Sequence, residues 1–538
     1  MRSTFTGIEI SKRALFTQQA ALTTTGHNIS NANTAGYSRQ VVNMVASKPL
    51  EYPGMMRSNV PGQMGQGVEF TSITRIREKF LDDQFRNENK QLGNYSIQND
   101  TLDKLQAIVN EPTDTGIRSV LDKFWKSWTD LAKDPENVSG RKLVRENANA
   151  LADAFNATSK QLSDLSNDLT SNIDVKANQI NSLTTTISSL NNEIFRIEGL
   201  GKDNANDLRD QRDLLTDQLS KIVNISVVET PQGYTINMGN TNLVTGQTTT
   251  AVTAATLVTA MNSGNLNSGE VYGMIVSRDR YVADYQQQLD TLANSIANGQ
   301  VQITIPAGSV IPDGSVLMVP TNNPTGPAYT PVTYSGPVAN RTLASDLTVM
   351  VQGINGLHKL GYTFATPAAK GVDFFTAKTG ATVTAATFQL NPVIANDPNY
   401  ISTSMRTTGT APNETAVKGN NTLALLISQL KDSKFSFNNG GTTNGAPSIM
   451  NGTLDDYFRS IVGQLGVQAQ TTSRQTDNQK AMVDQIEDRR QSVSGVSLDE
   501  EMSNMIKFQH AYGAASRFMT TFDQILDKLI NSTGVVGR

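Results

Sequence analysis

The chain contains no cysteine, which excludes disulfide bonds and metal sites built from thiolates. Histidine is also scarce, because His27, His358 and His510 are the only three and lie far apart in the sequence. None of them has the spacing of a metal-binding pair such as H-E-x-x-H. We therefore predict a protein without a metal and without a cofactor.

Long apolar runs and an excess of positive charge are missing too. No run of 18 apolar residues occurs, so we expect no membrane insertion. The net charge is −4, from 45 basic and 49 acidic residues, and it offers no basic excess for binding nucleic acid. The N-terminus lacks the continuous apolar segment of a secretory signal peptide. Taken alone, these features predict a cytoplasmic protein.

Motifs of enzymes are absent or isolated. The sequence has no G-x-S-x-G and no Walker loop. Ser428-Gln-Leu-Lys431 matches S-x-x-K, but so short a pattern arises by chance in a long chain and has no S-D-N or K-T-G companion in order. We predict that the protein is not an enzyme.

What the sequence does contain is a long amphipathic helix at its C-terminal end. From Leu498 onward, apolar residues recur in alternating steps of three and four, the spacing of a helix that packs on other helices. Together they cover about half the circumference, which is too wide for one two-stranded seam. We therefore expect this helix to need several neighbours. The residues that we predict at its interface are Leu498, Met502, Met505, Phe508, Tyr512, Phe518, Met519, Phe522, Ile525, Leu526 and Leu529.

The start of the chain offers a partner for this helix. Ile8, Leu15, Leu22 and Ile29 recur every seven residues, which predicts a second amphipathic helix. The stretch 26–36 is rich in Asn, Ser, Thr and Gly, residues that favour turns and caps over a continuing helix. We predict a loop there.

Between the two ends, the sequence predicts mostly helices. The stretch 141–197 has no Pro or Gly, and its apolar row predicts one helix about 85 Å long, with a stutter near its middle. Further helices are expected at 76–109, 116–132, 206–223, 271–297, 421–430 and 454–491, and a hairpin near 225–245. From residue 299 the composition shifts to Pro, Gly, Val and Thr, as in short strands joined by turns.

These patterns predict a mainly α fold with inserted β structure, in nested discontinuous domains. Residues 1–50 and 495–538 form a terminal α-helical coiled-coil domain. Residues 51–298 and 413–494 form a long-helix rod domain that contains the hairpin. Residues 299–412 form a mainly β outer domain, which includes a returning helix near 343–358.

Two sequence motifs carry a resemblance to a known family. Thr25-Gly-His-Asn-Ile-Ser-Asn-Ala-Asn-Thr-Ala-Gly-Tyr-Ser-Arg-Gln40 resembles the N-terminal signature of bacterial flagellar rod, hook and hook-associated proteins. Gly495-Val-Ser-Leu-Asp-Glu-Glu-Met502 and Tyr512-Gly-Ala-Ala-Ser-Arg517 resemble their C-terminal signature. The Gly-Tyr-Ser-Arg-Gln ending is most similar to that of the hook–filament junction members. Ala35 departs from the family, which often has Pro there and so a more rigid turn.

The resemblance implies a structural subunit of the extracellular flagellum that forms a ring or tube with copies of itself. It implies that hook protein lies below it, and a second junction protein or the filament above. It further implies an export chaperone on the C-terminal helix, and passage through the flagellar type III export apparatus without a cleaved signal peptide. It also implies that the loop residues Asn28, Asn31, Asn33, Gly36 and Tyr37 are assembly contacts.

A physical argument supports assembly through the ends. In a monomer, terminal helices with wide apolar faces have too few partners to offset their ordering entropy. In a polymer, each pair buries apolar area on its neighbours. We therefore expect a charge at Phe522 to spare the monomer and to abolish the polymer.

Three alternatives remain open from the sequence. One is another axial flagellar protein, of the hook or the distal rod, although the long helix at 141–197 favours the junction protein. A second is a cell-wall hydrolase on a flagellar scaffold, for which the sequence shows no paired-carboxylate site. The third is an adhesin whose inserted β structure binds glycans.

Overall fold

The computed structural model describes residues 5–48, 65–109, 116–199, 201, 203–321, 328–364, 369–380, 382–410, 414–437 and 449–531. The chain forms two compact units. Unit 1 comprises Met1–Ser96, Ile173–Gly273 and Gln475–Arg538, and unit 2 comprises Ile97–Asn172 and Met274–Arg474. The domain boundaries predicted at 50–51 and 412–413 lie outside the described residues.

Helices dominate the described part of the chain, and the predicted mainly α class with inserted β structure is confirmed. In chain order the helical segments are α1 (Thr6–Ser30), α2 (Lys79–Val109), α3 (Ile117–Lys133), α4 (Val138–Glu198), α5 (Asn206–Ile222), α6 (Ala254–Asn262), α7 (Glu270–Val276), the π-helical η1 (Ser277–Val282), α8 (Ala283–Asn298), α9 (Val338–Arg341), α10 (Gly353–His358), α11 (Pro392–Asn396), the 3-10 turn η2 (Pro398–Tyr400), α12 (Thr422–Gln429), the 3-10 turn η3 (Leu430–Asp432), α13 (Leu454–Ser494) and α14 (Leu498–Asn531).

The strands form small antiparallel sheets. In unit 1, β1 (Gln40–Ala46) pairs with β2 (Val68–Arg75), and a four-stranded sheet has the order β3 (Ser226–Thr230), β4 (Gly233–Met238), β5 (Thr241–Thr245), β6 (Thr248–Thr249). In unit 2, a six-stranded sheet has the order β16 (Asn451–Gly452), β15 (Phe435–Ser436), β7 (Gln300–Ile305), β10 (Leu347–Gln352), β8 (Ser315–Pro320), β9 (Tyr329–Tyr334). Two further strand pairs come between β10 and β15 in the sequence, β11 (Phe375–Ala377) with β12 (Phe388–Leu390) and β13 (Thr407–Thr408) with β14 (Thr415–Ala416).

The longest element is α4, and its apolar row is buried as predicted. The helix has 61 residues, which corresponds to about 90 Å at the usual rise per residue. Side chains along its whole length are buried, among them Val144, Phe155, Leu162, Ile173 and Ile187. The spacing of three and four therefore identified a helix packed on one side over many turns.

One predicted helix, at 343–358, is wrong over most of its length. Leu347–Gln352 is strand β10, which pairs with β7 from Leu347 opposite Ile305 to Gln352 opposite Gln300. Val349 and Val351 are buried at alternate positions, where β-branched side chains suit a sheet better than a helix. Only Gly353–His358 is helical, and Gly353, with φ of +49°, allows the sharp change from strand to helix.

The loop predicted from residue 26 begins later. α1 continues to Ser30, and its polar residues fit the helix by bonding to carbonyls one turn back. The Thr24 hydroxyl donates to Ala20 O at 3.0 Å, and the Ser30 hydroxyl donates to Gly26 O at 2.8 Å. Such bonds keep Ser and Thr satisfied inside a helix, so their abundance did not end it.

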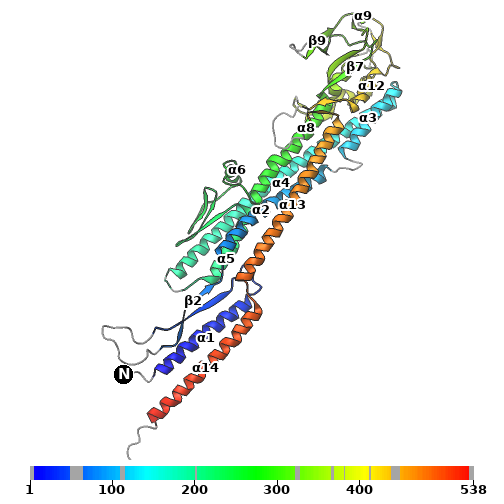
Figure 1. Cartoon of the computed structure of the whole chain (residues 1–538). Helices are drawn as coiled ribbons and strands as arrows, with labels where there is room; N and C mark the ends of the chain where they lie inside the picture. The colour runs from blue at the N-terminus through cyan, green and yellow to red at the C-terminus, as the bar shows by residue number, and fades with distance from the viewer. Residues whose placement is uncertain are drawn as a thin grey trace, which may run out of the picture. The chain divides into compact units, whose positions relative to one another are not determined.

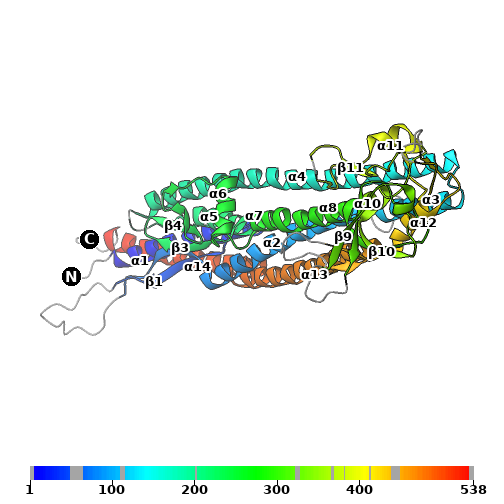
Figure 2. The ribbon, with the colours of Figure 1, turned by 90° about the horizontal axis from the view of Figure 1, so that it is seen from above.

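The four-stranded sheet of unit 1 packs on two helices that precede it in sequence (Figure 2). Asn191 of α4 donates to Tyr234 O and Gly246 O, and the Tyr234 hydroxyl donates to Asp213 of α5 at 2.6 Å. The hairpin predicted near 225–245 is the pair β3–β4, and its range extends over β5. β6 and α6 come from the Thr- and Ala-rich stretch that follows, where no element was predicted.

The core of unit 2 is rich in aromatic rings. Phe124, Trp125 and Trp128 of α3 are buried. Phe124 contacts Phe374 and Phe375 with ring centroids 6.0 and 5.7 Å apart. The two tryptophans of the chain therefore pack within a core, as expected for Trp residues three apart on one helix.

Candidate assembly interface

α1 and α14 lie side by side and antiparallel in unit 1 (Figure 1). The start of α1 meets the end of α14, because a Cβ atom added to Gly7 would lie 2.3 Å from the Phe522 ring. At the other end, the side chain of Asn28 donates to Glu501 at 3.1 Å. α1 and α14 therefore form one antiparallel pair of helices, which we call the terminal helix pair.

Small and polar residues form the buried face of α1. The buried positions are Gly7, Ser11, Thr17, Ala21, Thr24, Thr25 and Asn28. The predicted stripe of Ile8, Leu15, Leu22 and Ile29 is only partly buried. Short side chains let α14 and the β1–β2 sheet approach the helix closely, so the heptad of large residues does not mark the best-covered face.

α14 is apolar on more faces than α1 covers. Of the predicted interface residues, Leu526 is buried and Met505, Phe508, Met519 and Phe522 are partly buried. The predicted residues that stay exposed are Leu498, Met502, Tyr512, Phe518, Ile525 and Leu529.

The exposed residues form two stripes, in steps of four or seven residues. One contains Leu498, Met502 and Ile506, and the other contains Phe518 and Ile525. Ile525, at 52% exposed, is typical of them. Apolar side chains along a helix at such spacing form a continuous surface for a neighbouring helix, so most of the predicted interface of α14 is open in the single chain.

The N-terminal signature folds into a junction inside the chain. Asn28 is 1% exposed. Its amide NH2 donates to Gln40 O at 2.9 Å, while its oxygen accepts from Gln40 N at 3.0 Å and from the Tyr37 hydroxyl at 2.8 Å. His27 Nδ1 lies 3.0 Å from the Tyr37 hydroxyl oxygen, within hydrogen-bond distance. Asn28 therefore fixes the loop after α1 and has no surface left for another molecule.

Arg39, which also belongs to the N-terminal signature, connects this loop to α14. Its Nε donates to Glu501 and its Nη1 donates to Glu500, both at 2.8 Å. Its backbone N–H donates to Ser494 O at 2.8 Å. Because Glu501 also accepts from Asn28, one buried carboxylate joins the N-terminal and C-terminal signatures. We call Asn28, Tyr37, Arg39 and Glu501 the signature clamp.

Ser38 connects the clamp to a buried cluster of charges in unit 1. The Ser38 backbone N–H and hydroxyl both donate to Asp210 at 2.8 Å. The cluster, which we call the arginine–aspartate cluster, consists of Arg75, Arg77, Arg86, Arg490, Asp82, Asp210, Asp213 and Asp217. It brings together β2, α2, α5 and α13.

Asp213 lies at the centre of this cluster. Burial alone would raise its pKa, but Arg77, Arg75 and Arg86 outweigh burial and hold the pKa of Asp213 well below its usual range. Burial, followed by the nearby charges of Asp207 and Asp210, raises the pKa of the Tyr37 hydroxyl. The arginines and aspartates of the cluster pair with one another, which is the condition under which buried charges are tolerated.

The remaining predicted loop residues lie around the clamp. Asn31 donates to His27 O at 3.0 Å, and Asn33 is exposed. Gly36 has a φ of +79°, and a Cβ there would lie 3.0 Å from Leu214, so both backbone and packing favour glycine. The Asn- and Gly-rich composition thus builds an internal turn.

Sequence reasoning missed Arg39, Glu501 and Ile506. The sequence did point to the first two, because each stands inside a signature motif. Arg39 and Glu501 are 462 positions apart in the chain, however, and only the fold shows that they pair with each other. Ile506 is not among the residues that we predicted at the interface of α14.

Metal binding and membrane insertion were the other functions considered for the described residues. No group of three or more His, Asp or Glu residues in that part of the chain could hold a metal ion. None of the helices in the described ranges is both long enough and apolar enough to cross a membrane.

Three family models match parts of the chain. Residues 102–300 match the flagellar hook-associated protein FlgK helical domain. Residues 480–532 match the C-terminal region of flagellar basal body rod FlgEFG proteins, and residues 8–37 match the flagella basal body rod protein family. The last two matches fall on α14 and α1, with the clamp residues Asn28, Tyr37 and Glu501 inside them.

Whole proteins are similar as well. The chain is 33% identical to flagellar hook-associated protein 1 of Bacillus subtilis, in an alignment that covers 100% of both. It is 26% identical to the Escherichia coli protein of that name, over 95% of this chain and 97% of that protein. Among solved structures, the flagellar hook junction protein FlgK from Burkholderia pseudomallei aligns with 77% of this chain and 100% of its own, at 18% identity and a TM-score of 0.47.

Proposed function

The chain belongs to the flagellar hook-associated protein 1 family, and from this premise we propose that its terminal helix pair assembles with copies of itself to join hook and filament. Membership confirms the resemblance of its two signatures. As a family member, the protein is a structural component of the bacterial flagellum that self-assembles and associates with the hook.

The observation that carries the proposal is the exposed apolar surface of α14. Burying a whole Ile, Phe or Met side chain stabilises by about 1.5–3 kcal/mol. Met502, Ile506, Phe518 and Ile525 are each about half exposed, so each would contribute about 1 kcal/mol when a neighbour covers it. The contribution repeats at every contact between subunits in a ring or tube. The interface that we propose therefore contains the two stripes and leaves out Asn28.

The signature clamp has a supporting role in this proposal. It holds α1 and α14 in one register through Glu501, and through Ser38 it connects them to the arginine–aspartate cluster. A paired and anchored hairpin presents the stripes in one orientation, which lowers the ordering cost of assembly. We propose that residues 1–50 and 495–538 act as the assembly domain, that 51–298 with 413–494 act as its rod, and that 299–412 form the outer domain.

The finer partners are part of the same proposal. A second junction protein would contact the assembled ring, and an export chaperone would cover the stripes of α14 before secretion. Export through the type III apparatus without a cleaved signal would place the protein outside the cell. We further propose that the protein has no catalytic activity of its own.

A charge in one stripe tests the function. We expect Ile525→Asp to leave the circular dichroism and melting temperature of the monomer near wild type, because the residue is half exposed there. In the assembly the new carboxylate would be buried without a partner, at a cost of several kcal/mol. Cells that make only this variant should build hooks but release filament subunits into the medium.

The matched control is Gln524→Asp, which adds the same charge one residue away. Gln524 is exposed on the polar side of α14, with Arg517 and Lys528. This variant should assemble normally. Secretion of both variants must be measured, since a chaperone would bind the same helix. Normal filaments on cells with secreted Ile525→Asp protein would contradict the proposed interface.

A further inference from the structure

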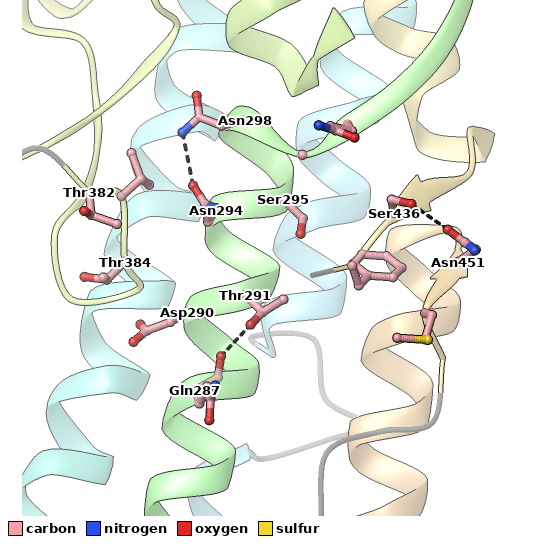
Figure 3. Close-up of a pocket in the computed structure, with 15 residues that line it drawn as sticks. Gln287, Asp290, Thr291, Asn294, Ser295, Asn298, Thr382, Thr384, Ser436 and Asn451 are labelled. Carbon is pink, nitrogen blue, oxygen red and sulfur yellow. Dashed lines mark hydrogen bonds between the residues drawn. The ribbon is translucent and has the colours of Figure 1, made fainter. Parts of the chain in front are cut away.

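Unit 2 contains an open groove beside α8 with a volume of about 610 Å³. Figure 3 shows α8 in the middle, the loop with Thr382 and Thr384 on one side, and Ser436 and Asn451 on the other. The volume falls within the range of about 300–1,000 Å³ that is usual for small-molecule sites. The residues that line the groove belong to unit 2, whereas the terminal helix pair belongs to unit 1.

The lining of the groove is polar and almost uncharged. Amide and hydroxyl side chains predominate, and among the described residues that line it Asp290 is the only one with a charge. A site for an anionic ligand would present Arg or Lys side chains. The lining therefore disfavours phosphates, nucleic acids and acidic polymers as ligands.

Several of these polar groups keep hydrogen-bonding capacity for a ligand. Asn294 uses its side-chain oxygen to accept from Asn298 at 3.1 Å, and within the described ranges its NH2 group donates to no other residue. The side chain of Gln287 makes no hydrogen bond to another described residue, although its backbone carbonyl accepts from Thr291. Asp290 accepts from Ala385 N–H at 2.7 Å through one oxygen, which leaves the other for a ligand.

The orientation of Asn294 is fixed by a row of amides. Asn355 donates to Asn298 at 3.0 Å, and Asn298 in turn donates to Asn294. Asn355 is buried and also accepts from Phe375 N–H at 2.8 Å. Groups that are oriented before binding lose less entropy when a ligand arrives.

We propose that this groove binds a neutral saccharide, with Gln287, Asp290 and Asn294 as the contacting residues. A sugar hydroxyl both donates and accepts, and a side-chain amide offers both functions to it. The carboxylate oxygen of Asp290 that Ala385 does not use can accept from a sugar hydroxyl, and Asp290 lies between Gln287 and Asn294 on α8. Because the described residues of the lining include no cation, sialylated and sulfated saccharides should bind more weakly than their neutral counterparts.

The test uses the full-length protein on an array of neutral oligosaccharides, with sialylated and sulfated forms of the same backbones beside them. Titration calorimetry with maltotriose, cellotriose and chitotriose then measures affinity. We expect saturable binding of at least one neutral saccharide. Asn294→Ala and Asp290→Asn should each weaken it by about tenfold, which corresponds to the loss of one good hydrogen bond.

The control variant is Asn167→Ala, which removes an exposed amide of unit 2 from α4, away from the groove. It should bind as the wild type does, and all variants should keep the wild-type circular dichroism. The proposal is overturned if no neutral saccharide binds saturably at millimolar concentration, if anionic glycans bind better, or if Asn294→Ala and Asn167→Ala have the same affinity. None of these outcomes bears on assembly through α14.

Discussion

Two adjacent glutamates of α14 contact the same arginine in different surroundings, and this makes the signature clamp testable. Glu501 is 3% exposed and accepts from Arg39 at 2.8 Å and from Asn28 at 3.1 Å. Glu500 is 62% exposed and accepts from Arg39 at the same distance of 2.8 Å. If distance alone decided the contribution, the two residues would be equal.

Burial should make them unequal. Removing one partner of a buried pair costs about 3–5 kcal/mol, because the other is left uncompensated. Arg39 is 20% exposed and would keep Glu500, so we expect Glu501→Ala to cost about 2–3 kcal/mol. An exposed ion pair contributes about 0.2–1 kcal/mol, and Glu500→Ala should cost no more than that. Both variants remove one charge from the first turn of α14, so the effect on the helix dipole is matched.

The assay is hydrogen exchange by mass spectrometry on the full-length monomer. Glu501→Ala should accelerate exchange in α1 and in the first half of α14, while the peptides of α4 and unit 2 keep their wild-type rates. Glu500→Ala should change little, and its small effect should vanish in high salt, where exposed charges are screened. Equal effects of the two substitutions, or no effect of Glu501→Ala, would refute the clamp.

Two further predictions concern the units on their own. Gly93→Ala should destabilise unit 1 by about 2 kcal/mol or more, because the new Cβ would lie 2.2 Å from the backbone oxygen of Lys221. Gly26→Ala, whose Cβ would meet nothing within 4 Å, should instead stabilise α1 by up to about 1 kcal/mol. Chemical denaturation measures both changes. His358 is buried in unit 2, and this burial lowers its pKa from 6.5 to about 4. The neutral ring therefore contributes about 3 kcal/mol to the free energy of unfolding, which is present above pH 6.5 and lost as the pH falls towards 4. The gap in unfolding free energy between wild type and His358→Gln should narrow over that range, and a constant gap would contradict the assignment.

Helices could be predicted from sequence where apolar residues repeat at helical spacing, in long rows such as those of α4 and α14 and also in short segments such as α12. α4 and α14 repeat their spacing over many turns, so local pattern and packing agree. The prediction of a helix at 343–358 was wrong because a short apolar run fits the spacing of a helix and that of a strand equally well. Pairing with β7 decides for the strand. Such pairing is a non-local contact that the run itself does not encode.

The candidate site divides in the same way. The apolar surface of α14 follows from its own sequence, since exposure there depends on what the rest of the chain fails to cover. The role of Asn28 and Arg39 could not be predicted, because their partner Glu501 lies 473 positions from Asn28. Phe522 was expected on the open surface, but it packs over Gly7, and Ile525 therefore replaces it as the test position.

In the assembled flagellum, the exposed stripes of α14 should become buried between subunits. The chain has no cysteine, so Ile525→Cys or Gln524→Cys introduces a single thiol whose reaction with a maleimide reports its accessibility. In the monomer both thiols should react at similar rates. In isolated flagella, Cys at 525 should be protected while Cys at 524 should still react. Equally fast labelling of position 525 in monomer and flagella would show that the stripe is not buried between subunits.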